Sequence, residues 1–219
     1  MKFLKALALS LLVAKAAFAL TEGVEYKVLP QPLAQPLVSG AADKTFVEVW
    51  AYRCTHCNKW HKGDVVGKIA AGNPDVKISY MLLPSAGDHG TLAAQVFAYA
   101  HAQDDKAGKP LQAADSLYHK LMDVYFTAYF KNKASLGTKE ESDKFYSHGF
   151  AVLGIDKAKL DEFLASDEGK KYLEYGAQAE AYKAFGTPGP IVNGKYLLDI
   201  SKFGSPQALV DAVKELSAK

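Results

Sequence analysis

The sequence is poor in sulfur: its 219 residues include 2 cysteines and 3 methionines, one of which is the first residue. A structural zinc cluster with three or four cysteine ligands needs more thiols than this chain has. A scaffold held together by several disulfides is excluded for the same reason. A chain of this length, 49% hydrophobic, does not need a disulfide to fold, so its two thiols are available for chemistry.

The chain also lacks a long uncharged apolar run beyond its first 20 residues, so no transmembrane helix is expected there. Residues 1–19 combine two early lysines, an apolar run over 6–14, and Ala17-Phe18-Ala19. These are the basic region, apolar core and small-residue cleavage site of a secretory signal peptide. We expect cleavage before Leu20 and export of the mature chain. The alternative, an uncleaved membrane anchor, needs roughly 17–25 apolar residues.

An excess of basic charge is missing once this leader is removed. The leader carries three lysines, so the basic count falls from 26 to 23 against 24 acidic residues, and the formal net charge changes from +2 to −1. Nucleic-acid binding requires clustered basic surface, and no nucleic-acid partner is expected. The remaining 200 residues have the size of one domain, or of one domain with an insertion.

Apolar periodicity in the first half of the mature chain predicts a βαβ unit. A near-continuous apolar strand over residues 45–52 indicates burial on both faces. A helix over 54–71, kinked at Gly63, and a second strand over 76–83 follow it. The two strands are therefore expected to be parallel, with a right-handed crossover.

The rest of the chain has a different character. Residues 89–185 show helical spacing without a convincing strand, with a capping box at 138–141 and a helix cap at Asp156. Asn193-Gly194 between two apolar runs predicts a hairpin, and Ser205 is expected to cap a C-terminal helix. The sequence thus predicts an α/β fold interrupted by a helical insertion.

Both cysteines lie in Cys54-Thr55-His56-Cys57, directly after the predicted buried strand. A sulfur at the first turn of a helix lies near unpaired backbone N–H groups and the positive end of the helix dipole, which favours the thiolate of Cys54. Cys57 is one turn further on the same face and can close a disulfide. His56 and Arg53 can add positive charge. Stabilising the thiolate stabilises the reduced protein, so the disulfide becomes a stronger oxidant.

Other uses of the two thiols are possible. A structural zinc site is disfavoured because His56 lies between the thiols and cannot easily ligate alongside both. A Cu(I) carrier with two thiolate ligands remains open, although a methionine-rich motif is missing. A purely structural disulfide across so short a loop adds little stability. The other histidines are expected to be surface or core residues rather than ligands: His89, His101, His119 and His148.

The chain resembles the DsbA-type periplasmic thiol:disulfide oxidoreductases, including their DsbL branch. The resemblance rests on Cys54-Thr55-His56-Cys57 after an apolar strand, and on Gly186-Thr187-Pro188 followed by a hairpin over residues 192–196. It implies a thioredoxin fold with an inserted helical domain. The implied parts are residues 20–88, the helical insertion and connecting helix 89–185, and residues 186–219.

The resemblance also implies roles for individual residues. Cys54 would be the nucleophile that forms mixed disulfides, and Cys57 its buried partner. Pro188 would be a cis proline facing the thiols, and the backbone of Thr187 would bind an extended substrate strand. Glu48, the one charge within its strand, would be a buried acid that relays protons. The alternative for Glu48 is a position at the rim of the sheet.

The sequence departs from the family pattern at two positions. Thr55 stands where many members have proline, and Tyr80 stands where many have a lysine that pairs with the buried acid. The first residue influences the redox potential, and the second influences proton handling around Glu48. Trp50 and Trp60, on either side of the thiols, are expected to pack and to report the redox state by fluorescence.

We therefore expect a monomeric disulfide oxidase in the periplasm that acts on reduced or unfolded exported proteins. A DsbB-type membrane quinone reductase would re-oxidise it, and neither a cofactor nor a metal is expected. Two alternatives stay open: a reductase or isomerase of the same fold, and a Cu(I) carrier without turnover.

Overall fold

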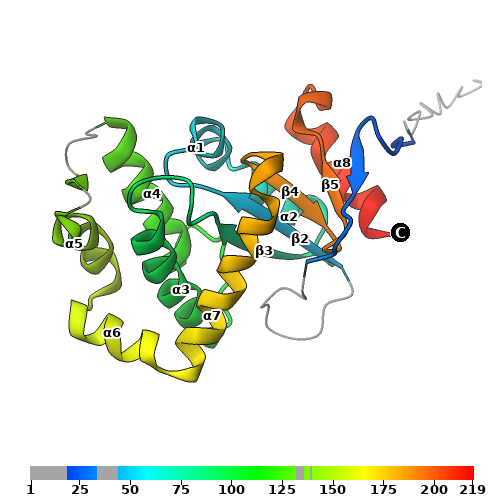
Figure 1. Cartoon of the computed structure of the whole chain (residues 1–219). Coiled ribbons are helices and arrows are strands. Elements are labelled where there is room, and N and C mark those ends of the chain that lie inside the picture. The colour runs from blue at the N-terminus through cyan, green and yellow to red at the C-terminus, as the bar shows by residue number, and fades with distance from the viewer. Residues whose placement is uncertain (1–18, 34–43, 132–135, 139) are drawn as a thin grey trace, which may run out of the picture.

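A five-stranded mixed sheet forms the centre of the protein, in the order β1-β5-β4-β2-β3 (Figure 1). This computed structural model describes residues 19–33, 44–131, 136–138 and 140–219. The predicted signal peptide, apart from Ala19, lies outside them. The strands are β1 (Tyr26–Val28), β2 (Thr45–Trp50), β3 (Lys77–Leu82), β4 (Gly189–Val192) and β5 (Tyr196–Leu198).

The directions of the strands follow from the connections between them. β2 and β3 are parallel, as the predicted βαβ unit requires, and β4 pairs antiparallel with both β2 and β5. Asn193 and Gly194 both have positive φ angles in the β4–β5 turn, which confirms the predicted hairpin. All six residues of β2 are buried, because layers of helices cover both faces of the sheet.

The helix predicted over 54–71 is two helices, α1 (Thr55–Lys62) and α2 (Val65–Gly72). The prediction of one kinked helix was therefore wrong. Asp64 has a φ of 49° and leaves the right-handed helical conformation. The helix is therefore interrupted at this residue rather than bent at Gly63. α2 packs against α8 (Pro206–Ser217), whose predicted cap is confirmed by a hydrogen bond of 3.2 Å from the Ala208 N–H to the Ser205 hydroxyl.

A block of helices separates β3 from β4, as the sequence predicts. It contains α3 (Gly90–Lys106), α4 (Leu117–Lys131), α5 (Ser142–Leu153), α6 (Lys157–Ala165), α7 (Asp167–Ala177) and a 3₁₀ segment (Gln178–Phe185). Asp156 accepts a hydrogen bond from the Lys159 N–H and caps α6, which confirms its predicted role. Half of the predicted capping box forms: the Thr138 N–H donates to Glu141 at 2.9 Å, and α5 begins only at Ser142.

An aromatic cluster joins this insertion to the sheet. Trp50, the last residue of β2, is fully buried and makes edge-to-face contacts with Phe97, Tyr118 and Phe126 from α3 and α4. The Trp50 indole N–H donates to the Tyr118 hydroxyl at 3.0 Å. Aromatic pairs of this geometry add about 0.5–1.5 kcal/mol each beyond their buried area. The aromatic stripes of the helices are therefore core, as expected, and they fix α3 and α4 against the strand that leads to the cysteines.

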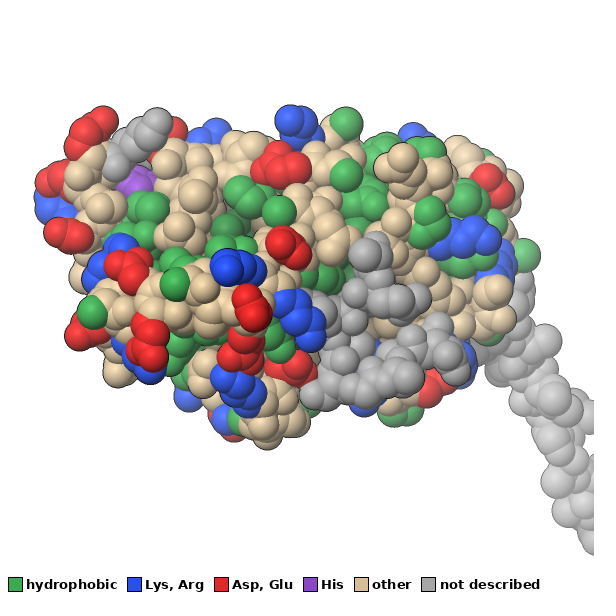
Figure 2. Space-filling view, turned by 60° about the horizontal axis from the view of Figure 1, so that its bottom comes forward, with side chains coloured by type: hydrophobic (Ala, Val, Ile, Leu, Met, Phe, Trp, Pro, Cys, Tyr) green, Lys and Arg blue, Asp and Glu red, His purple; other side chains and the backbone are tan. Residues whose placement is uncertain are grey.

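The surface over α6 and α7 carries both signs of charge. Figure 2 shows basic and acidic side chains interspersed there, and ion pairs such as Lys106–Glu168 and Lys159–Glu162 connect them. Among the residues that the structure describes, no helix combines the length and apolarity needed to cross a membrane. The parallel β2–α–β3 unit, the antiparallel β4–β5–α8 unit and the helices between them form a thioredoxin fold with a helical insertion.

Candidate active site

Cys54 and Cys57 form a disulfide at the beginning of α1. Cys54 is the N-cap residue, one position before the first turn, with extended backbone angles (φ −77°, ψ 116°). The Cys57 N–H donates to the Cys54 sulfur, at an N–S distance of 3.0 Å. Cys54 is partly exposed, whereas Cys57 is fully buried. An external thiolate can therefore reach the first sulfur and not the second.

This geometry favours negative charge on Cys54 after reduction. The sulfur already lies where an N-cap side chain accepts a backbone hydrogen bond, at the positive end of the α1 dipole. A thiolate accepts that hydrogen bond more strongly than a neutral thiol does. The two features from which the sequence predicts a stabilised thiolate, a helix N-terminus and a donating backbone N–H, are thus present around Cys54.

A distant loop completes the site. The carbonyl oxygen of Thr187 lies 3.3 Å from the Cys54 sulfur, although 133 positions separate the two residues. The Thr187–Pro188 peptide bond is cis, as the resemblance predicts. The sheet register explains the proximity: Val49 pairs with Gly189 in antiparallel strands, so the residues before β4 meet those after β2.

Three polar side chains around the disulfide are exposed: Arg53, Thr55 and His56. His56 makes no hydrogen bond, ion pair or ring contact with the residues that the structure describes. Its side chain is therefore available to a thiolate or a substrate. Arg53 is the only arginine in the sequence, and it immediately precedes Cys54.

Glu48 lies in the middle of the sheet with 2% of its surface exposed, so a rim position is excluded. It pairs with Tyr80 across β2–β3 and with Pro190 across β2–β4. Its Oε1 atom has no hydrogen-bond partner among the described residues. Burial raises the pKa of Glu48 from 4.5 to about 8, which means that the carboxyl is largely neutral at pH 7.

A small cavity connects Glu48 to α1. Trp60 and His61, one helical turn after Cys57, line it together with Glu48, Tyr80 and His119 from the sheet and α4. Its volume is about 10 Å³, room for one small occupant such as a water molecule. Sequence reasoning did not find this juxtaposition, because His61 and His119 lie in different elements 58 positions apart.

A larger hollow lies beside Thr187 and Pro188. It has a volume of about 350 Å³, and Phe185, Leu198 and Ile200 supply much of its apolar lining. Phe185 is 45% exposed, one of the few large hydrophobic side chains on the described surface. Its position two residues before Thr187 was the available signal in the sequence, and sequence reasoning missed it.

A disulfide at a helix N-terminus, facing a cis-proline loop across a thioredoxin sheet, is the arrangement of a thiol:disulfide oxidoreductase. The chain belongs to the DSBA-like thioredoxin family: the family model described as "DSBA-like thioredoxin domain" matches residues 47–214. The family predicted from the sequence is therefore confirmed.

Individual relatives agree with this assignment. The chain is 31% identical over 212 residues to the thiol:disulfide interchange protein DsbL of Escherichia coli O6:H1, covering 96% of this chain and 92% of that protein. It is 29% identical over 193 residues to the thiol:disulfide interchange protein DsbA of Pseudomonas aeruginosa, covering 85% and 79%. The crystal structure of DsbL from Salmonella enterica serovar Typhimurium superposes with a TM-score of 0.82 at 30% identity, covering 92% and 98% of the chains.

The burial of Glu48 predicts a particular dependence of stability on pH. Between pH 4.5 and about 8 the folded protein holds a proton that the unfolded chain has released, so the free energy of unfolding falls as pH rises through this window. The difference between the two pKa values corresponds to at most about 5 kcal/mol. Glu48→Gln is therefore expected to unfold like the wild type near pH 4 and to be more stable by about 2–5 kcal/mol above pH 8.

Urea unfolding of the oxidised protein at a series of pH values measures this difference. Glu174→Gln, which removes an exposed carboxyl on α7, is the matched control and is expected to follow the wild type throughout. Parallel stability curves for Glu48→Gln and the wild type between pH 4 and 9 would show that Glu48 is ionised in the folded protein.

Proposed function

We propose that the protein oxidises cysteine pairs in exported proteins. The observation that carries this proposal is the partly exposed Cys54 sulfur, which already accepts the Cys57 N–H. A site that stabilises the Cys54 thiolate makes the reduced protein more stable relative to the oxidised protein. Its disulfide is therefore readily transferred to a substrate. This distinguishes an oxidase from a reductase of the same fold.

The proposed reaction is a two-step exchange. A substrate thiolate attacks the Cys54 sulfur, the Cys54–Cys57 bond breaks, and Cys57 leaves with the electron pair. The second substrate thiolate then attacks the substrate sulfur of the mixed disulfide, and Cys54 leaves as a thiolate. The substrate has lost two electrons and gained a disulfide, while the protein holds two reduced cysteines.

Glu48 and His56 are proposed to assist at different steps. A neutral Glu48 can deliver a proton toward buried Cys57 when it leaves, through an occupant of the cavity that Glu48 shares with Trp60 and His61. His56 and Arg53, both exposed beside Cys54, can offer positive charge to the Cys54 thiolate. Thr55 does not block this approach, since its side chain is also exposed.

The cis-proline loop is the proposed substrate site. Thr187 can bind an extended substrate backbone next to the sulfur, as an added strand. The Thr187 carbonyl lies 3.3 Å from the Cys54 sulfur, so it is within reach of the substrate cysteine that attacks Cys54. The hollow lined by Phe185 then receives an apolar side chain of the substrate, with Pro188 at its edge.

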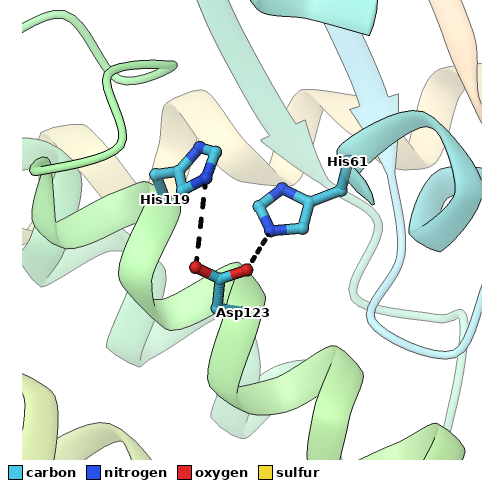
Figure 3. Close-up of side chains that lie close together, drawn as sticks. All are labelled: His61, His119 and Asp123. Atoms are coloured by element: carbon cyan, nitrogen blue, oxygen red, sulfur yellow. Dashed lines mark hydrogen bonds and ion pairs between the residues drawn. The ribbon is translucent and has the colours of Figure 1, made fainter. Parts of the chain in front are cut away.

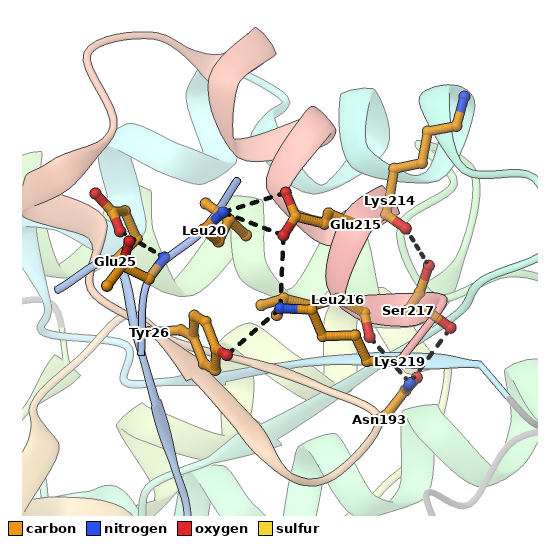
Figure 4. Close-up of polar contacts among 10 residues, drawn as sticks. Leu20, Glu25, Tyr26, Asn193, Lys214, Glu215, Leu216, Ser217 and Lys219 are labelled. Carbon is orange, nitrogen blue, oxygen red and sulfur yellow. Dashed lines mark hydrogen bonds and ion pairs between the residues drawn. The ribbon is translucent and has the colours of Figure 1, made fainter. Parts of the chain in front are cut away.

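The proposed place of action is the periplasm, after removal of residues 1–19. The Leu20 N–H donates to both carboxylate oxygens of Glu215 on α8, at 3.1 and 3.3 Å (Figure 4). Cleavage before Leu20 would turn this amide into an ammonium group in the same position, and the attraction to Glu215 would increase. The mature protein is proposed to act as a monomer and to be re-oxidised by a DsbB-type membrane quinone reductase.

The redox midpoint of the disulfide tests the proposed direction. We expect a value near −120 mV for an oxidase, against about −270 mV for a thioredoxin-like reductant. The measurement is a glutathione titration of the mature protein, followed by the fluorescence of Trp50 and Trp60. Cys54→Ser serves as the variant without the disulfide and should show no transition. A midpoint below about −250 mV would point to the reductase alternative.

The hollow beside Pro188 predicts an effect on substrate affinity. Phe185→Ala removes an apolar surface worth about 1 kcal/mol of substrate contact, so KM for a reduced two-cysteine peptide is expected to rise about fivefold with kcat and the midpoint unchanged. Val24→Ala is the control, because Val24 is equally exposed (46% against 45%) and does not line the hollow. Equal KM values for the two variants would exclude this binding site.

The contact of Leu20 with Glu215 predicts the mature N-terminus. Mass spectrometry of the exported protein is expected to give a chain that begins at Leu20. Glu215→Gln should then lower the free energy of unfolding of this mature chain by about 0.5–1 kcal/mol, the size of a surface ion pair, and that of the uncleaved precursor by less. Any other N-terminus, or an equal loss in both forms, would contradict the proposal.

A further inference from the structure

A group of potential metal ligands lies outside the exchange chemistry, between α1 and α4. It consists of His61, in the last turn of α1, and His119 and Asp123, one turn apart on α4 (Figure 3). The ligand atoms of all three residues lie within 4.8 Å of one another. The two histidines direct Nε2 toward the same carboxylate, at 2.7 Å from Oδ1 for His61 and 3.9 Å from Oδ2 for His119.

The histidine rings are held in place by packing. Their centroids are 4.4 Å apart, and His61 also packs against the ring of Phe126 at 5.4 Å. The side chain of His61 is 5% exposed and that of His119 is 17% exposed.

A small cavity lies beside two of the three ligands. His61 and His119 line the small cavity that also contains Glu48, whose buried Oε1 has no hydrogen-bond partner among the described residues. Asp123 closes the group on its outer side with 61% of its side chain exposed. An ordinary ion pair with Asp123 would need only His61. It explains neither the imidazole of His119 nor the unpaired Oε1 of Glu48.

We propose that His61, His119 and Asp123 bind one divalent transition-metal ion of the zinc class. Two imidazole nitrogens and one carboxylate oxygen suit such ions and are a poor match for Mg²⁺ or Ca²⁺, which prefer oxygen ligands alone. Three protein ligands leave a fourth position for water, as in open zinc sites. The ion would join the helix that carries Cys57 to the helical insertion.

Zinc binding by the oxidised, untagged mature protein tests this proposal. The disulfide keeps Cys54 and Cys57 from acting as ligands. Calorimetry is expected to show one Zn²⁺ per chain, and the melting temperature should rise with Zn²⁺ and not with Mg²⁺. Co²⁺ should give visible absorption bands of a four-coordinate site and should quench Trp60, which lines the same cavity.

Two variants and one control connect the binding to these residues. Asp123→Asn and His119→Gln alter the more accessible ligands and are each expected to weaken Zn²⁺ binding at least tenfold. His148→Gln, a partly buried histidine on α5 outside the group, should bind like the wild type. Absence of stoichiometric binding to the wild type, an equal response to Mg²⁺, or unchanged affinity in both ligand variants would overturn the proposal. Melting curves without metal verify that each variant is folded.

Discussion

The chemistry of this protein depends on one hydrogen bond, from the Cys57 N–H to the sulfur of Cys54. It exists because α1 begins immediately after Cys54, four residues beyond Trp50, where the fully buried β2 ends. The aromatic contacts of Trp50 with α3 and α4 hold that strand end in place. The packed end of β2 thus supports the Cys54 sulfur from below. It holds the N-terminus of α1 in the position where it stabilises negative charge.

The same sheet has the opposite effect on Glu48. The sulfur of Cys54 is at a helix end where an anion is stabilised, whereas Glu48 is inside the sheet where burial raises its pKa to about 8. One strand–helix unit therefore holds two opposite environments: the helix end favours an anion on the Cys54 sulfur, and the sheet interior favours the neutral form of Glu48. The proposed exchange uses this difference, since one sulfur leaves as an anion and the other gains a proton.

Much of this site could be predicted from the sequence because its causes are local. The apolar strand before Cys54, the Asn193-Gly194 turn and the cap at Ser205 each follow from a few neighbouring residues. The break at Asp64 was missed because its left-handed conformation is unusual for a residue other than glycine. The cluster of His61 with His119 could not be found at all, since the packing of α1 against α4 depends on tertiary contacts of the whole aromatic core.

The two sides of the disulfide differ physically, and this difference suggests how specificity arises. On the side of the insertion, α4 supplies His119 and Asp123 to the end of α1, so this side is filled and charged. On the side of the cis-proline loop, Phe185 and Ile200 border an open hollow. In the proposed reaction, an incoming chain gains apolar contact with Phe185 and Ile200 in this hollow. Under the substrate binding proposed above, Thr187 and the hollow beside it supply the contact with the substrate, while the insertion presents polar groups to the end of α1.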